Sequence, residues 1–70
     1  MEPFRRKIVA KIKAELKASG KTQEKLAYEI DMSKGFLGEI LAGKKSFRIE
    51  VLKRIADGLG LKAKDLLPDE

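Results

Sequence analysis

Several polar residues between positions 22 and 45 have the chemistry to bind a polyanion. Gln23 offers amide donors at the predicted start of a helix, where the backbone N–H groups also favour an anion. Lys44 and Lys45 are adjacent ammonium groups in a predicted loop. Lys34 can donate to guanine O6 or N7, and Glu39 can accept from cytosine N4. These residue types predict hydrogen bonds to phosphates and base edges.

The composition argues against catalysis and metal binding. The chain has no histidine and no cysteine, so the commonest general base, the usual metal ligands and disulfides are all missing. No acidic loop with alternating Asp and Gly suggests a calcium site. We therefore expect no enzyme activity, no cofactor, no metal and no small-molecule ligand. No apolar run approaches the roughly 20 residues that span a bilayer, so we expect a cytoplasmic protein without a membrane partner.

Positive charge is concentrated at one end of the chain. The 16 Lys and Arg residues outnumber the 11 Asp and Glu residues, for a net charge of +5. Residues 1–21 carry seven of the cations and only two carboxylates. This distribution fits a polyanionic partner, and it fits a solvated helix face equally well. Charge supports a nucleic-acid partner without establishing one.

Residues 22–41 predict two short helices joined by a tight turn. Thr22 can cap the first helix, whose apolar residues Leu26, Ala27 and Ile30 fall on one face. Ser33 can cap the second helix, and its inward face then consists of Leu37, Ile40 and Leu41. The interruption at Ile30-Asp31-Met32 is too short for anything but a sharp turn between packed helices. This is the helix-turn-helix unit, whose second helix enters the DNA major groove.

The remaining residues predict three more helices around this unit. A helix over 3–18 begins at Pro3 and ends at Ser19-Gly20, with an apolar stripe of Phe4, Ile8, Ile12 and Leu16. A loop over 42–46 leads into a helix that we expect from about Phe47 to Gly58. A fifth helix over 63–67 is closed by Pro68. The predicted fold class is all-α, a compact bundle of five short helices in a single domain over residues 1–70.

Five sequence segments at matching spacings resemble a known family. They are TQEKLA (22–27), MS (32–33), ILAGK (40–44), LKRIADGLGL (52–61) and DLL (65–67). With these segments taken together, the chain resembles the phage-repressor-like (lambda-repressor-like) helix-turn-helix proteins over about residues 5–67. By size and by the stretch GKKSFRIEVLKRIADGL it also resembles restriction–modification controller proteins. That resemblance implies a homodimer bound to a palindromic operator.

Three departures from the family pattern are visible. Asp31 stands where the family usually has a glycine, and Asp tolerates the positive φ needed there. Leu16 and Leu41 replace an Arg–Glu pair, so we expect the two leucines to be buried together between the first and third helices. Gly38 replaces a frequent serine.

The resemblance implies that Gln23 binds a phosphate. Lys44 and Lys45 are predicted phosphate clamps, and Ser33 is mainly a cap. Phe36 either packs inward or touches a thymine methyl or the sugar backbone, while the two glycines of the helix favour close approach to another surface. The predicted DNA-binding residues are Thr22, Gln23, Ser33, Lys34, Gly35, Phe36, Gly38, Glu39, Lys44 and Lys45.

The sequence thus predicts a homodimeric, sequence-specific transcriptional regulator, such as a repressor, that binds double-stranded DNA. The alternative is an antitoxin-type or anti-repressor module that uses the same fold to bind a protein. Gln23 and the loop lysines favour phosphates over a protein groove. For the dimer, the candidate pairing residues are Phe47, Leu61, Leu66 and Leu67.

Overall fold

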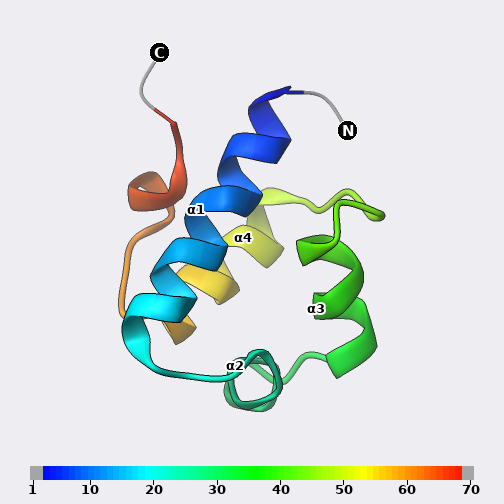
Figure 1. Ribbon diagram of the computed structural model, residues 1–70, viewed down its shortest axis with the longest axis vertical. Coiled ribbons are helices and arrows are strands. Elements are labelled where there is room, and N and C mark those ends of the chain that lie inside the picture. The colour runs from blue at the N-terminus through cyan, green and yellow to red at the C-terminus, as the bar shows by residue number, and fades with distance from the viewer. Residues whose placement is uncertain (1–2, 69–70) are drawn as a thin grey trace.

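Four α-helices and one short 3₁₀ helix make up the computed structural model, which describes residues 3–68 (Figure 1). In the described range they are α1 (Pro3–Ser19), α2 (Gln23–Glu29), α3 (Lys34–Leu41), α4 (Ile49–Gly58) and η1 (Ala63–Leu66). The all-helical prediction is confirmed for these residues. None of the described helices is long and apolar enough to cross a membrane.

The last element differs from the predicted fifth α-helix. Residues Ala63–Leu66 form a single 3₁₀ turn, and Leu67 is already extended, with φ −83° and ψ 140°. Pro68 explains this early end, because the proline ring excludes the helical conformation for the residue before it. The helix predicted from Phe47 also begins later, at Ile49, with Arg48 as its N-cap.

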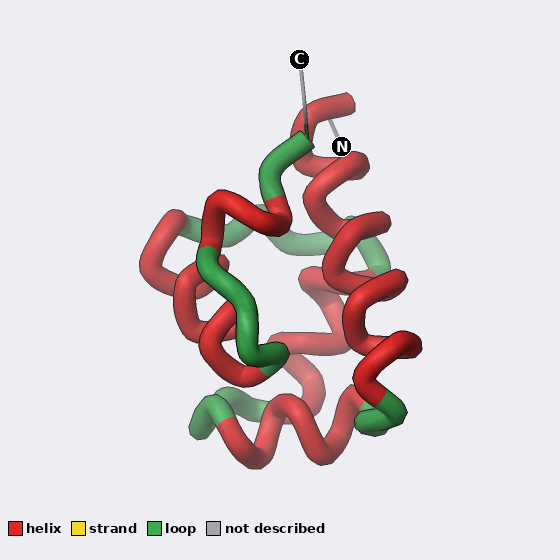
Figure 2. Tube along the Cα trace, turned by 90° about the vertical axis from the view of Figure 1, so that its left-hand side faces the viewer, coloured by secondary structure: helices red, strands yellow, loops and turns green. Residues whose placement is uncertain are grey.

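The hydrophobic core lies where the helices converge. Figure 2 shows α1 running along the molecule beside the shorter helices. Fourteen described side chains form one buried cluster: Ile8, Val9, Ile12, Leu16, Leu26, Ala27, Ile30, Leu37, Ile40, Leu41, Leu52, Ile55, Ala56 and Leu66. The predicted inward faces of α2 and α3 are confirmed. Leu16 and Leu41 are both buried, as expected. Phe4 was expected on the inner stripe of α1 but is 46% exposed, because it lies in the first turn, beyond the core.

The turn between α2 and α3 is held from both sides. Asp31 has φ 56°, which confirms the predicted left-handed residue. The Met32 N–H donates to the Ala27 carbonyl at 2.9 Å. From α4, the Arg54 guanidinium donates to the carbonyls of Ile30 and Asp31. Helix α4 therefore fixes the turn that orients α3.

A lysine ties the start of the helix-turn-helix unit to α4. The Lys21 ammonium donates to Glu29 Oε1 at 2.6 Å and to the Gly58 carbonyl at 2.5 Å. Its hydrogen bond lowers the pKa of Glu29 below the ordinary value. Gly58 in turn lies directly against α2, where it packs beside Leu26 and Ile30. These contacts set the spacing between α2 and α4.

Candidate nucleic-acid interface

The two predicted capping hydroxyls both cap their helices. The Thr22 side chain accepts from the Lys25 N–H at 3.0 Å, and Ser33 accepts from the Phe36 N–H at 3.0 Å. Both residues are exposed. Capping fixes where α2 and α3 begin, and so it places Gln23 and Lys34 as the first residues of their helices.

The start of α2 lies against the middle of α3. A Cβ atom built on Gly38 would lie 3.2 Å from Gln23 Nε2. On the same two helices, Lys34 Nζ lies 3.8 Å from Glu24 Oε2, with both side chains more than 70% exposed. The absence of a side chain at Gly38 therefore gives the Gln23 amide its place beside the exposed face of α3.

The end of α3 is joined to the following loop through Lys45. Its ammonium lies 3.4 Å from Glu39 Oε1 and 5.3 Å from the centre of the Phe36 ring. The Lys44 N–H donates to the Glu39 carbonyl at 2.9 Å. Gly43, with φ 78°, ends α3 as the sequence predicted. These contacts hold both loop lysines at the C-terminal end of α3.

The glycines and the phenylalanine of α3 have different surroundings. Gly35 is exposed, and a Cβ atom there would meet nothing within 4 Å. Phe36 is half-buried and packs against the core, while Lys45 covers its ring. The inward-packing alternative for Phe36 is therefore the one that the structure shows. Gly35 leaves the backbone of the first turn of α3 open to another surface.

All ten predicted residues thus lie on α3 or on the two segments next to it. Glu24 was not among them, although its carboxylate pairs with Lys34. Arg5 and Ser46 were not predicted either, yet they line a hollow together with Lys44 and Lys45. The sequence pointed to Arg5 only through the positive charge concentrated in residues 1–21. That charge is shared by seven cations, so it did not identify Arg5 as the one near the loop.

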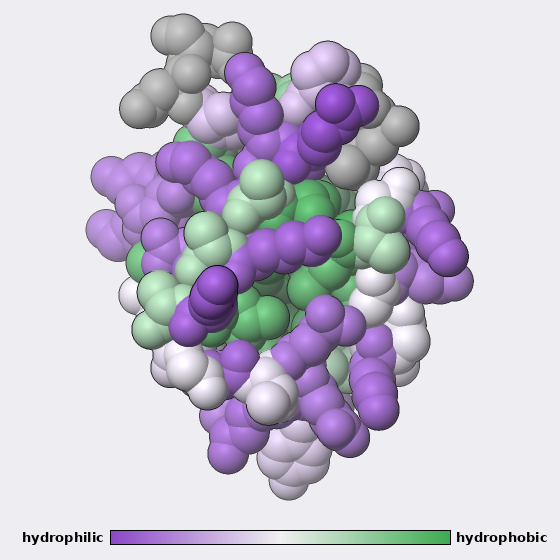
Figure 3. Space-filling model, viewed as in Figure 1, coloured by the Kyte–Doolittle hydropathy of each residue, from purple (hydrophilic) through white to green (hydrophobic). Residues whose placement is uncertain are grey.

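The surface between α1 and α3 combines an apolar floor with a hydrophilic border. Figure 3 shows hydrophilic side chains bordering an apolar floor between α1 and α3. That floor includes Val9 and Leu41, and Arg6 and Lys13 lie at its border. A polyanion that approaches α3 from this side meets cations of α1 as well as those of the loop.

Comparisons with known proteins agree with this geometry. Residues 12–66 match the helix-turn-helix family. Control protein C.BamHI from Bacillus amyloliquefaciens is 35% identical over 52 residues, which are 74% of this chain and 64% of that protein's length. Two crystal structures of the clp gene regulator ClgR from Corynebacterium glutamicum are similar, each with a TM-score of 0.82 and 28% identity. Each match covers 94% of this chain. It covers 71% of the ClgR chain in one crystal structure and 86% of the ClgR chain in the other.

Proposed function

Since the chain belongs to the helix-turn-helix family of DNA-binding transcriptional regulators, we propose that it binds a palindromic operator as a homodimer and regulates transcription there. Helix α3 enters the major groove. The observation that carries this proposal is the position of Gln23, whose amide lies beside Gly38 on α3. This contact brings a phosphate-type donor of α2 next to the helix that reads the bases.

Phosphate contacts come from the start of α2 and from the loop after α3 in this proposal. Thr22 and Gln23 face one backbone at the start of α2, with Ser33 fixing the start of α3. Lys44 and Lys45 face the DNA backbone at the other end of the helix. Both lysines are exposed. The Lys45 ammonium is shared with the Glu39 carboxylate, which a phosphate must displace.

Base reading falls to the exposed face of α3. Lys34 donates to guanine and Glu39 accepts from cytosine. Gly35 and Gly38 bring the helix backbone close to the base edges. Few long side chains lie on this face, so the DNA shape contributes part of the specificity. The similarity to C.BamHI supports a controller-type regulator.

The proposal is tested by binding to mixed-sequence duplex at two salt concentrations. Wild-type affinity should fall steeply with salt, and Lys44→Ala should weaken binding to all duplexes alike. The salt slope is the slope of log affinity against log salt concentration. For Lys44→Ala its magnitude should be smaller by about one unit for each phosphate that a half-site no longer binds. Fluorescence anisotropy of a labelled duplex measures both quantities.

Lys64→Ala is the matched control for this experiment. Lys64 is exposed and lies on η1, away from α3 (Figure 1). Both variants lose one positive charge, so a shared change in slope would show only an effect of net charge. Wild-type binding that does not respond to salt would contradict the proposal and favour the protein-binding alternative.

A homodimer follows from the small footprint of one recognition helix. A single helix contacts only a few base pairs, too few for selectivity over a genome. Two copies side by side can place two helices one DNA turn, about 34 Å, apart. The molecule measures 31 × 22 × 20 Å, which suits that spacing.

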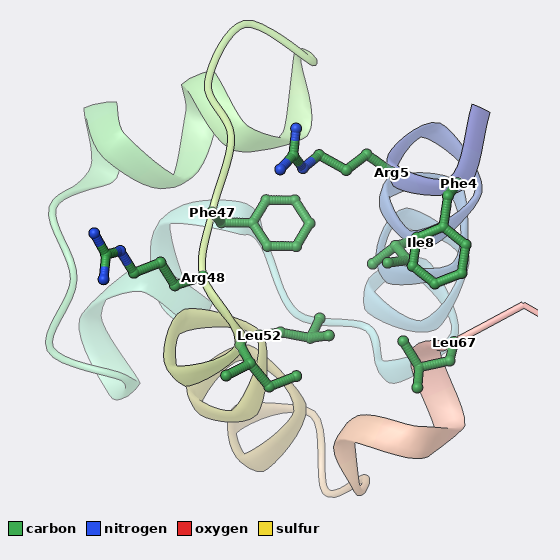
Figure 4. A pocket seen from close by; sticks show the side chains of 8 residues that line it. Phe4, Arg5, Ile8, Phe47, Arg48, Leu52 and Leu67 are labelled. Carbon is green, nitrogen blue, oxygen red and sulfur yellow. The ribbon is translucent and has the colours of Figure 1, made fainter. Parts of the chain in front are cut away.

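The proposed pairing surface keeps Phe47 and Leu67 from the sequence-based list and adds Phe4 and Ile49. Leu61 does not line this surface. Leu66 is fully buried in the core of one chain, so it is not available for pairing. Phe47 and Leu67 line a hollow of about 250 Å³ together with Phe4 and Ile49, as Figure 4 shows for the three residues it labels. Phe4 and Ile49 are 46% and 55% exposed. Arg5 and Arg48 also line this hollow. We propose that a second copy covers its apolar part.

Sedimentation of the wild type at tens of micromolar should show a dimer, and Ile49→Asp should shift it to monomer. Aspartate in the first turn of α4 suits the helix dipole, so the fold should persist. Tyr28→Asp is the control, because Tyr28 is 83% exposed on α2. Wild-type protein that stays monomeric with and without operator would contradict the dimer.

A further inference from the structure

The first turn of α1 reaches the loop that follows α3. Arg5 lines a hollow of about 110 Å³ together with Gly43, Lys44, Lys45 and Ser46. Figure 4 shows the Arg5 side chain extending from α1 toward this loop, away from Phe4 and Leu67. Two segments that lie far apart in the sequence thus form the walls of one hollow.

The lining of this hollow is rich in hydrogen-bond donors. Arg5 contributes a guanidinium, the two lysines contribute ammonium groups, and Ser46 contributes a hydroxyl. The Glu39 carboxylate lies beside this group, 3.4 Å from the Lys45 ammonium. The residues that line the hollow include three cations and no carboxylate, so its wall is positively charged. Arginine beside lysines suits a phosphate, because its planar fork can donate two hydrogen bonds to one anion.

The place of the hollow determines which phosphate it can reach. It lies at the C-terminal end of α3, whereas Gln23 lies beside the middle of that helix. When α3 occupies the major groove, the two sets of donors face different parts of the DNA backbone. The hollow therefore faces a phosphate that the start of α2 does not reach.

We propose that Arg5, Lys44, Lys45 and Ser46 form a composite site for one DNA backbone phosphate, which makes α1 a DNA-contacting element. This inference rests on the proposed DNA-binding function. It assigns a role to Arg5, which neither the helix-turn-helix unit nor the sequence pattern identified. The site contributes affinity and register without base preference.

Neighbouring cations on α1 provide a matched comparison. Lys7 follows Arg5 by two residues, so at 3.6 residues per turn it lies on nearly the opposite side of the helix. Lys7 is exposed and does not line the hollow. Arg5→Ala and Lys7→Ala each remove one positive charge from the same helix end, but only Arg5 lines the hollow. Arg5 also lines the hollow proposed for pairing, so sedimentation must show that both variants stay dimeric.

The test measures affinity for the operator duplex, selected with wild-type protein from a random pool, between 50 and 200 mM salt. Removal of one phosphate contact should reduce the salt slope by about 0.9. For each lost contact, the ratio of wild-type affinity to Arg5→Ala affinity should be about three- to fourfold larger at 50 mM salt than at 200 mM salt. A dimer loses one contact in each half-site, so the ratio should then change by about tenfold. Lys7→Ala should keep a slope close to wild type, and base preference should be unchanged in both variants.

A second measurement combines these variants with changes in the DNA. Duplexes that carry a neutral methylphosphonate at single backbone positions should reveal one position in each half-site where the wild type loses more affinity than Arg5→Ala, because Arg5→Ala has already lost one of the donors to that phosphate. A Lys44→Ala variant should be less sensitive than the wild type at that same position. If Arg5→Ala folds poorly by circular dichroism, Arg5→Gln takes its place in this comparison, because glutamine removes the charge and keeps a long side chain with good helix propensity.

Two different failures can be told apart. If the wild type does not bind duplex in a salt-dependent way, the proposed function fails and this inference fails with it. If the wild type binds, but Arg5→Ala and Lys7→Ala change the slope equally and no methylphosphonate position distinguishes them, the composite site is overturned alone.

Discussion

Glu39→Ala is expected to bind mixed-sequence duplex more tightly than the wild type while it loses discrimination at one base pair of each half-site. Glu39 is exposed on α3, and its carboxylate lies 3.4 Å from the Lys45 ammonium. Removing it frees Lys45 for phosphate and eliminates one repulsive charge at the DNA surface. It also removes the acceptor for cytosine N4, at roughly 1–3 kcal/mol per base contact.

Lys34→Ala should show the complementary pattern. Loss of its ammonium removes a donor to guanine, so discrimination at a different base pair should fall by roughly 1–3 kcal/mol as well. Non-specific affinity should also fall, because the variant has one cation fewer. Lys34 pairs with Glu24 only at 3.8 Å, between two highly exposed side chains. Such a pair is weak, so DNA competes with it readily.

Both predictions are measured on operator duplexes that carry each of the four bases at each position. Glu15→Ala is the control for Glu39→Ala, since Glu15 is exposed on α1 and lies outside the interface. It should change affinity slightly and discrimination not at all. Glu39→Gln separates charge from hydrogen bonding, because the amide keeps an acceptor oxygen.

The pairing of Glu39 with Lys45 offers a competing explanation that the same data can decide. If Glu39 only holds Lys45 in place, Glu39→Ala leaves base preference unchanged and its effect on affinity disappears in a Lys45→Ala background. That outcome would remove Glu39 from the recognition face.

Local features of the fold were predictable from sequence because their causes are local. The caps Thr22 and Ser33, the left-handed Asp31 and the end of α3 at Gly43 each depend on residues within one turn. The apolar spacing of α2 and α3 predicted the correct inward faces. The wrong element was the one over 63–67, where Pro68 stops the helix after one 3₁₀ turn.

Contacts between distant segments were not predictable in the same way. The approach of Arg5 to the loop at Lys44 depends on how α1 packs on α3, which periodicity does not specify. The same holds for the Lys45 ammonium over Phe36 and for Arg54 at the carbonyl of Ile30. A single sequence does not indicate which residues from distant segments come into contact. The candidate site was therefore predicted along α3 and missed on α1.

Gly58→Ala is expected to destabilise the fold by about 1–3 kcal/mol, the usual cost of overpacking a core. A Cβ atom at Gly58 would lie 2.5 Å from Ile30 Cγ2 and 2.6 Å from Leu26 Cδ1. Leu26 is fully buried and Ile30 is 8% exposed, so neither side chain can move into solvent. Relief of the clash requires α4 to move away from α2.

The expected loss is large for a chain of this size. At roughly 0.05–0.15 kcal/mol per residue, about 4–10 kcal/mol stabilise a 70-residue domain. Each kcal/mol of destabilisation corresponds to a fall of about 4–8 °C in Tm for a domain of this size. Thermal and urea unfolding followed by circular dichroism measure the change directly.

Gly35→Ala is the matched control, because Gly35 also lies within a helix and its Cβ position is open. Alanine there should raise stability by up to about 1 kcal/mol through helix propensity alone. The opposite signs of the two substitutions separate steric conflict from propensity. Equal stabilisation by both would mean that α2 and α4 are farther apart than the structure has them.

A double variant tests the named contact rather than the position alone. Ile30→Ala removes the Cγ2 atom that lies nearest to the new methyl group, so Gly58→Ala should cost less in that background. Ile30 also carries the carbonyl that Arg54 holds at the start of the turn. Displacing Ile30 therefore shifts the turn and α3 with it. Gly58→Ala should consequently weaken operator binding even at temperatures where the variant stays folded, and the Ile30→Ala background should restore part of that affinity.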